Sequence, residues 1–252
     1  MKIIWHGTAS IEISTHNGSI LFDPFVPLKG SPIDIKLEEF VGFDDIFITH
    51  GHFDHIANLP EIYQLNPNVK IRCTKTPYRT LIKSGIPKEN LVLINFGDEL
   101  SVHDFKIRVY HGKHAVLPKP TLKRAHTYVH APTRGNIPYI IHENKRCREN
   151  DETVFYEIEA EGKHVSLMGS LNLRDDADYP TNSELLIMAY NGWEDNFPPA
   201  VRAIEALKPQ KIFLDHFDNT FPPLTEEVNV APILEKYSGK IQLLEHKKTE
   251  VL

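Results

Sequence analysis

A six-residue segment of the chain contains four side chains of the types that bind metal ions. It reads His50-Gly51-His52-Phe53-Asp54-His55. Imidazole nitrogens and carboxylate oxygens are ligands that suit zinc, iron or manganese. Several such groups must converge on one point to hold an ion, and a turn at the end of a strand can aim them there. The segment therefore predicts a metal site rather than a solvated loop that is rich in histidine.

The other ligands must come from distant parts of the chain, because one loop cannot close the shell around an ion. Polar residues that follow predicted strands are the best candidates: His111 and His114, then Ser170, then His216. The strands that precede these residues and the histidine cluster are Phe43–Thr49, Phe105–Tyr110, Lys163–Met168 and Lys211–Leu214. If these strands end at one edge of the sheets, their loops share a site.

The order of the predicted elements in the first half is echoed in the second. Short strands over residues 3–22 lead into alternating strands and helices. A second run of strands, over residues 99–168, again leads into alternation. That alternation includes a helix predicted over Glu226–Tyr237, which Pro232 interrupts. The pattern predicts an α/β (α+β) protein in a single domain spanning residues 1–252.

Several segments together resemble those of the metallo-β-lactamase superfamily. Within it, the chain resembles the branch of the L-ascorbate-6-phosphate lactonase and of other metal-dependent hydrolases. The resemblance covers essentially the whole chain. The segments that carry it are Trp5–Ser10, Ile20–Phe25, Thr49–His55, Gly192-Trp193, Leu207–Pro209 and Leu214–Asp218. It implies a four-layer αββα sandwich with metal ions at one edge of the sheets.

The resemblance also implies a set of ligands. His50 and His52 would bind a first metal with a third histidine, and Asp54, His55 and His216 would bind a second. The third histidine is His114 or His111, and the spacing after the strand favours His114. One or two divalent ions are expected, zinc in the first place and manganese or iron as alternatives.

Position 170 departs from the family pattern. Most relatives carry there an aspartate that bridges both metals, whereas this chain has Ser170. A neutral serine is a poor bridging ligand, which predicts a single metal, a weak second metal, or a substitute from Asp175, Asp176 or Asp178. Asp23 is expected to accept a hydrogen bond from the outer N–H of a ligand histidine.

Residues 115–150 differ in charge from the rest of the chain. They contain seven lysines and arginines against two glutamates, with four prolines that break any long element. This segment reads as a basic insertion or lid. Within it, Lys123 and Arg124 are candidates for binding an anionic substrate. The alternatives are an oligomer contact and a soluble surface.

The predicted chemistry is metal-dependent hydrolysis of a small, anionic ester, lactone or phosphodiester. A metal lowers the pKa of bound water and creates a hydroxide nucleophile, and Asp54 would orient that water or carry its proton. One rival is an iron-dependent redox enzyme on the same fold. The other is a non-catalytic metal-binding module, which Ser170 alone favours.

Composition restricts the partners and the location. The formal net charge of −6 and the absence of an RNA-binding appendage argue against nucleic acid as a partner. No apolar run is long enough to span a membrane, and the start resembles no signal peptide. Two cysteines give no disulfide framework. A cytoplasmic protein that acts on a small molecule is expected, and a homo-oligomer stays open.

Overall fold

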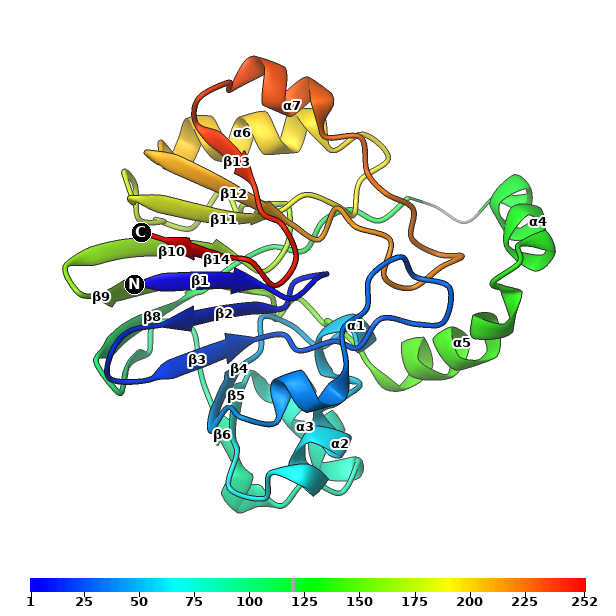
Figure 1. The fold of residues 1–252 in the computed structure, drawn as a ribbon, viewed down its shortest axis with the longest axis horizontal. Coiled ribbons are helices and arrows are strands. Elements are labelled where there is room, and N and C mark those ends of the chain that lie inside the picture. Colours follow the sequence, from blue (N-terminus) through cyan, green and yellow to red (C-terminus); the bar gives the residue numbers. More distant parts are fainter. Residues whose placement is uncertain (119–120) are drawn as a thin grey trace.

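This computed structural model describes residues 1–118 and 121–252, without the side chains of Lys123 and Arg124. Within that part, fourteen strands form two sheets of seven (Figure 1). The first sheet has the order β14-β1-β2-β3-β4-β5-β6 and the second the order β13-β12-β11-β10-β9-β8-β7. The strands are β1 Lys2–Trp5, β2 Ile11–Ser14, β3 Ser19–Phe22, β4 Asp45–Phe47, β5 Lys70–Cys73, β6 Leu91–Leu93, β7 Glu99–Val102, β8 Phe105–His111, β9 Val154–Ala160, β10 Lys163–Met168, β11 Leu185–Ala189, β12 Lys211–Asp215, β13 Ile241–Leu243 and β14 Thr249–Val251.

The two sheets repeat one topology. In the first, β1, β2 and β3 pair antiparallel, and β3 to β6 pair parallel. In the second, β7 to β10 pair antiparallel, and β10 to β13 pair parallel. Hairpin turns suffice for the antiparallel pairs, whereas a parallel pair needs a longer crossover. The predicted echo between the two halves of the chain is therefore confirmed.

Three apolar clusters hold the layers together. The largest lies between the sheets and includes Trp5, Phe22, Phe105, Tyr156 and Phe213. Helices α1 Phe53–Ile56, α2 Leu59–Leu65 and α3 Lys75–Lys83 pack on the first sheet, and α6 Phe197–Leu207 and α7 Ala231–Lys236 pack on the second. Figure 1 shows α6 and α7 at the opposite end of the molecule from α2 and α3. This arrangement confirms the predicted αββα sandwich. Short 3-10 helices occupy Leu37–Phe40, Lys88–Asn90 and Arg134–Asn136.

Helix α7 is shorter than predicted. The helix expected over Glu226–Tyr237 begins only at Ala231, with Pro232 in its first turn. Proline is tolerated at that position because the first N–H groups of a helix have no partner within the helix. Before α7, the Val228 N–H donates to the Phe217 carbonyl at 2.8 Å. This hydrogen bond holds the residues before the helix against the loop that follows β12.

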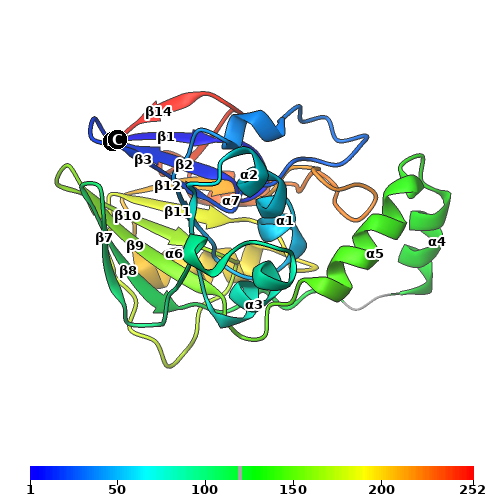
Figure 2. The same cartoon turned by 90° about the horizontal axis from the view of Figure 1, so that it is seen from below.

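The basic insertion contains two helices, α4 Leu122–His130 and α5 Ile137–Arg146. Residues 121–148, here called the helical arm, extend from the sandwich, and α4 lies farther out than α5 in both views (Figures 1 and 2). Pro138 stands at the start of α5 and so begins a helix instead of breaking one. No helix in the described parts of the chain is both long and apolar enough to cross a membrane.

Candidate metal centre

Two groups of three potential ligands lie where strand ends meet. The first triad is His50, His52 and His114, and the second triad is Asp54, His55 and His216. In each triad the ligand atoms all lie within 4.8 Å of one another. These residues follow β4, which belongs to the first sheet, and β8 and β12, which belong to the second. The edge of the sandwich thus gathers residues that are up to 166 positions apart in the chain.

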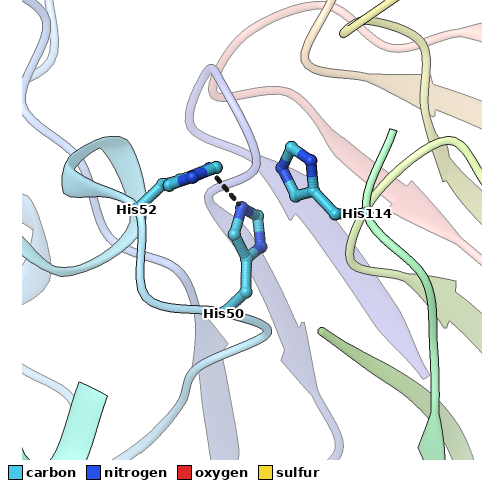
Figure 3. Close-up of side chains that lie close together, drawn as sticks. All are labelled: His50, His52 and His114. Atoms are coloured by element: carbon cyan, nitrogen blue, oxygen red, sulfur yellow. Dashed lines mark hydrogen bonds between the residues drawn. The ribbon is translucent and has the colours of Figure 1, made fainter. Parts of the chain in front are cut away.

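In the first triad three imidazole rings face one point (Figure 3). The His50 Nε2 and His52 Nδ1 atoms are 3.2 Å apart. The centre of the His114 ring lies 4.8 Å from that of His50 and 4.6 Å from that of His52. Tetrahedral zinc with Zn–N bonds of 2.0–2.1 Å would separate two ligand nitrogens by about 3.3 Å. The spacing of His50 and His52 therefore fits such an ion.

Hydrogen bonds fix the tautomers of two of these histidines. The His114 Nδ1 atom lies 2.8 Å from the Ala115 carbonyl oxygen, which only accepts, so Nδ1 carries the proton. The Thr49 hydroxyl donates to Asp23 Oδ2 at 2.6 Å and lies 3.1 Å from His50 Nδ1. It therefore accepts from the His50 Nδ1–H group. The Nε2 lone pairs of both histidines are left for a metal.

The second triad is connected by polar contacts of its own. His216 Nε2 lies 3.1 Å from Asp54 Oδ2, and His55 Nε2 lies 3.7 Å from the same oxygen. On its other side, His55 Nδ1 is 2.9 Å from Asp23 Oδ2. Asp23 thus contacts the outer nitrogen of a candidate ligand, which is the contact that the sequence predicts for it.

One buried pair, Asp23 and Thr49, supports both triads. The rings of His50 and His55 are adjacent, with their centres 3.9 Å apart. The Thr49 hydroxyl lies 3.3 Å from His55 Nδ1, in addition to its contact with His50. Asp23 also accepts the Thr49 backbone N–H at 2.8 Å. Both residues are fully buried, and their hydrogen bonds connect the two triads.

The electrostatics of the two triads differ. Burial lowers the pKa of His50 well below its usual range, that of His52 to about 4, and also that of His114. These imidazoles are therefore neutral at neutral pH, which is the form that binds metal. Burial opposes ionisation of Asp54, but the charge of His55 and the hydrogen bond from His216 outweigh it and lower the pKa of Asp54. Burial likewise opposes a charge on His216, yet Asp54 raises its pKa to about 9.

The backbone around the triads is unusual at three positions. Asp23 and His216 have positive φ angles of 45° and 59°. Such angles are uncommon outside glycine, although aspartate and histidine adopt them more readily than most residues. Gly51 lies against the Arg148 carbonyl oxygen, with which a Cβ at position 51 would collide. Residue 51 must therefore lack a Cβ where the end of the helical arm meets the metal loop.

Several predicted residues lie outside both triads. His111 Nε2 contacts the Asp151 carbonyl at 2.8 Å, and its ring stacks on Phe96. Asp175 pairs with Arg202 and Asp176 with Arg174, and the exposed fractions of these two aspartate side chains are 84% and 72%. Asp178 is also exposed. In the described structure, none of these three aspartates joins a triad.

Two further predictions concern Ser170 and the basic residues. The Ser170 hydroxyl accepts a hydrogen bond from the Ala115 backbone N–H at 3.0 Å, next to His114. The side chains of Lys123 and Arg124 lie outside the described residues.

The sequence did not reveal the supporting role of Thr49 or the contact of Arg148 with Gly51. For Thr49 a signal was present, since it is a polar residue between the apolar Ile48 and the histidine cluster. The Arg148 contact is made by a main-chain carbonyl, which any residue type supplies, so no sequence pattern marks it.

Comparisons with known proteins agree with this geometry. A family model described as "Beta-lactamase superfamily domain" matches residues 19–217. A UPF0173 metal-dependent hydrolase of Listeria welshimeri is 27% identical over 247 residues, which are 96% of each chain.

Among solved structures, the metallo-beta-lactamase fold protein YhfI from Bacillus subtilis is similar in fold, with a TM-score of 0.66 and 14% identity. The match covers 99% of this chain and 98% of that one. The Zn(2+)-bound PqqB from Methylobacterium extorquens gives a TM-score of 0.62 at 13% identity over the full length of both chains.

The matched region contains all six residues of the two triads. The narrower resemblance to the L-ascorbate-6-phosphate lactonase stays a prediction. Since the family model spans more than three quarters of the sequence, the chain belongs to the β-lactamase superfamily domain family.

Proposed function

We propose that this protein is a metal-dependent hydrolase whose two triads bind divalent metal. The observation that carries the proposal is the convergence of six ligand-type side chains at one edge of the sandwich. Proton positions fixed by Thr49 and Ala115 leave ligand lone pairs directed into the first triad. The names of relatives such as the Listeria welshimeri protein support the same reaction class.

Zinc is the metal that we expect, with manganese or iron as alternatives. A set of three histidines suits zinc, and the similar PqqB structure is described as zinc-bound. When bound, a divalent metal supplies Lewis acidity, which lowers the pKa of a water molecule and polarises the oxygen of the bond under attack. Asp54, which His55 and His216 keep ionised against the opposing effect of burial, would orient that water or accept its proton.

We expect a small anionic substrate, such as an ester, lactone or phosphodiester. The helical arm contains six lysines and arginines and one glutamate, in a chain that is acidic overall. It begins a few residues after His114, and at its end the Arg148 carbonyl touches Gly51 of the metal loop. Arg146 is already paired with Glu143, so the remaining cations of the arm are the ones expected to attract an anion.

The reaction class is tested by His50→Ala and His52→Ala. Each should reduce bound metal and lower the turnover of a panel of lactones and phosphodiesters by about 100-fold or more, because a hydrolytic metal site then lacks a ligand. His142→Ala is the control, since its side chain is 73% exposed on α5. Elemental analysis gives metal content, and circular dichroism checks the fold. Full metal content in both variants would show that the site is assigned wrongly.

The charge of the substrate is tested by ionic strength. Screening shortens the reach of exposed charges from about 30 Å at 0.01 M salt to about 3 Å at 1 M. The KM of an anionic substrate should therefore rise with salt, while that of an uncharged analogue of the same size stays constant. If the KM of the anionic substrate and the KM of the uncharged analogue are both independent of salt, the helical arm does not bind the substrate through its charges.

A further inference from the structure

The loop after β10 holds the main chain at His114 through two side chains. The Ser170 hydroxyl accepts a hydrogen bond from the Ala115 N–H at 3.0 Å. Two residues later, the Asn172 Nδ2 group donates to the His114 carbonyl oxygen at 3.0 Å. Two main-chain groups on either side of the same peptide bond are therefore held by one loop.

The geometry of this loop is itself fixed. The Asn172 N–H donates to the Ser170 carbonyl at 2.8 Å, which keeps the two side chains in register. Asn172 Oδ1 accepts the Leu173 N–H at 3.0 Å, so the amide must turn its Nδ2 group toward His114. Ser170 and Asn172 are only 8% and 7% exposed. Buried hydrogen bonds of this kind are costly to remove, because a donor is left without a partner.

The same loop also packs against the segment that carries His50 and His52, the other two members of the first triad. Gly169 lies against Thr49, whose Cβ would be 2.5 Å from a Cβ at position 169. The Gly169 N–H donates to the Val154 carbonyl at 3.2 Å, and the Val154 N–H donates to the Thr49 carbonyl at 2.8 Å. Residues 169–172 therefore span the space between Thr49, which precedes His50, and the segment that carries His114.

His114 depends on this support because it lies in neither a helix nor a strand. Its Nδ1–H donates to the Ala115 carbonyl at 2.8 Å, so the orientation of residue 115 decides where the His114 ring can lie. Ser170 fixes the N–H of that same residue. The contacts run from the Ser170 hydroxyl through Ala115 to His114 Nδ1, and so fix the direction in which the opposite ring nitrogen, Nε2, faces.

We propose that Ser170 and Asn172 form a clamp that positions His114, and that this is the function of the serine at position 170. Serine there is a positioning residue and not the remnant of a lost metal ligand. The proposal rests on the proposed function, because a clamp on His114 serves metal binding only if the first triad holds a metal. The hydrogen bonds themselves exist independently of it.

The first test is the zinc affinity of Ser170→Ala, measured by competition with a chromophoric chelator. Supporting contacts of a metal ligand are worth about 10- to 100-fold in affinity, so a loss of that size is expected for the tightest site. Ser166→Ala is the matched control, because Ser166 is buried on β10 and its hydroxyl has no hydrogen-bond partner within the described residues. It should change the affinity less than twofold. Asn172→Ala should weaken binding in the same direction as Ser170→Ala.

The second test uses the metal-free protein, so that it does not depend on the proposed function. Amide hydrogen exchange at Ala115 should be about tenfold faster in Ser170→Ala and unchanged in Ser166→Ala, because only the first removes its acceptor. Native zinc affinity in Ser170→Ala overturns the positioning role, and native exchange at Ala115 overturns the clamp. If the unmodified protein binds no zinc, the proposed function fails, and the exchange rate alone decides whether the clamp exists.

Discussion

At the scale of single residues, the Asp23 carboxylate contacts three polar groups near the two triads. Its Oδ1 accepts the Thr49 N–H, and its Oδ2 contacts both the Thr49 hydroxyl and His55 Nδ1. Through Thr49 it also reaches His50, which belongs to the other triad. A single buried carboxylate thus contacts groups on both sides of the candidate metal centre, from a residue whose backbone has a positive φ angle after β3.

We predict that Asp23→Asn weakens zinc binding about 10- to 100-fold and lowers the free energy of unfolding by about 1–3 kcal/mol. An amide replaces one acceptor oxygen with a donor, so either Thr49 or His55 loses its partner. Chelator competition and urea unfolding measure the two effects. Asp34→Asn, at an exposed position, should change neither quantity. If Asp23→Asn and Asp34→Asn change zinc affinity and the free energy of unfolding equally, Asp23 does not support the metal ligands.

Gly51 gives a second prediction at this scale. A Cβ there collides with the Arg148 carbonyl oxygen, so Gly51→Ala must push the arm and the metal loop apart. We expect a stability loss of about 1–3 kcal/mol, as for other overpacked sites, together with reduced metal content. Gly42→Ala is the control, because a Cβ there meets no described atom within 4 Å. A Gly51→Ala variant with native metal content and native stability would contradict the observed packing.

The sequence predicts the ligands that are neighbours in the chain better than those that are distant. His50, His52, Asp54 and His55 stand in one short segment, so their spacing alone brings them together. The choice between His111 and His114 depends on how the chain turns after β8. That turn is set by hydrogen bonds from Ser170 and Asn172, which lie more than 50 residues away. The alternation of apolar and polar residues along a strand does not predict these distant hydrogen bonds.

At the scale of elements, the strands were predicted more accurately than the helices near prolines. The predicted strands Phe105–Tyr110 and Lys163–Met168 agree with β8 and β10, because alternation and turn residues mark them locally. From the sequence, Pro232 and Pro138 predict interruptions, whereas in the structure each stands in the first turn of a helix. A proline permits both readings, and the packing around it decides which one holds.

The helical arm gives the prediction at this scale. Asn136 attaches the arm to the body, because its Nδ2 group donates to the Lys29 carbonyl at 2.9 Å and to the Pro222 carbonyl at 2.7 Å. Asn136→Ala should therefore speed hydrogen exchange across α4 and α5 while metal content stays the same, since no ligand is touched. Asn144→Ala, at an exposed position of α5, is the control. Unchanged exchange in Asn136→Ala would mean that other contacts hold the arm.

At the scale of the whole molecule, two sheets of the same topology meet at an edge that carries two unequal triads. The first triad has three histidines, whereas the second has two histidines and a carboxylate. No described carboxylate joins both triads, because position 170 is a serine whose hydroxyl is engaged with Ala115. Asp175 and Asp176 point to solvent and pair with arginines instead. Two cations at this edge would repel each other without a shared anion between them.

We therefore predict one tight and one weak metal-binding event, or a single event, in a stepwise zinc titration of the metal-free protein. At free zinc of about 100 times the tight Kd, the stabilisation is about 2.7 kcal/mol, which raises the Tm of a chain of this size by about 5–10 °C. His50→Ala should abolish this rise, and His216→Ala should preserve it. Ser170→Asp should tighten the second event if its carboxylate reaches the second triad while still accepting the Ala115 N–H. Two equally tight events in the unmodified protein would contradict the inequality of the triads and would require a bridging ligand other than residue 170.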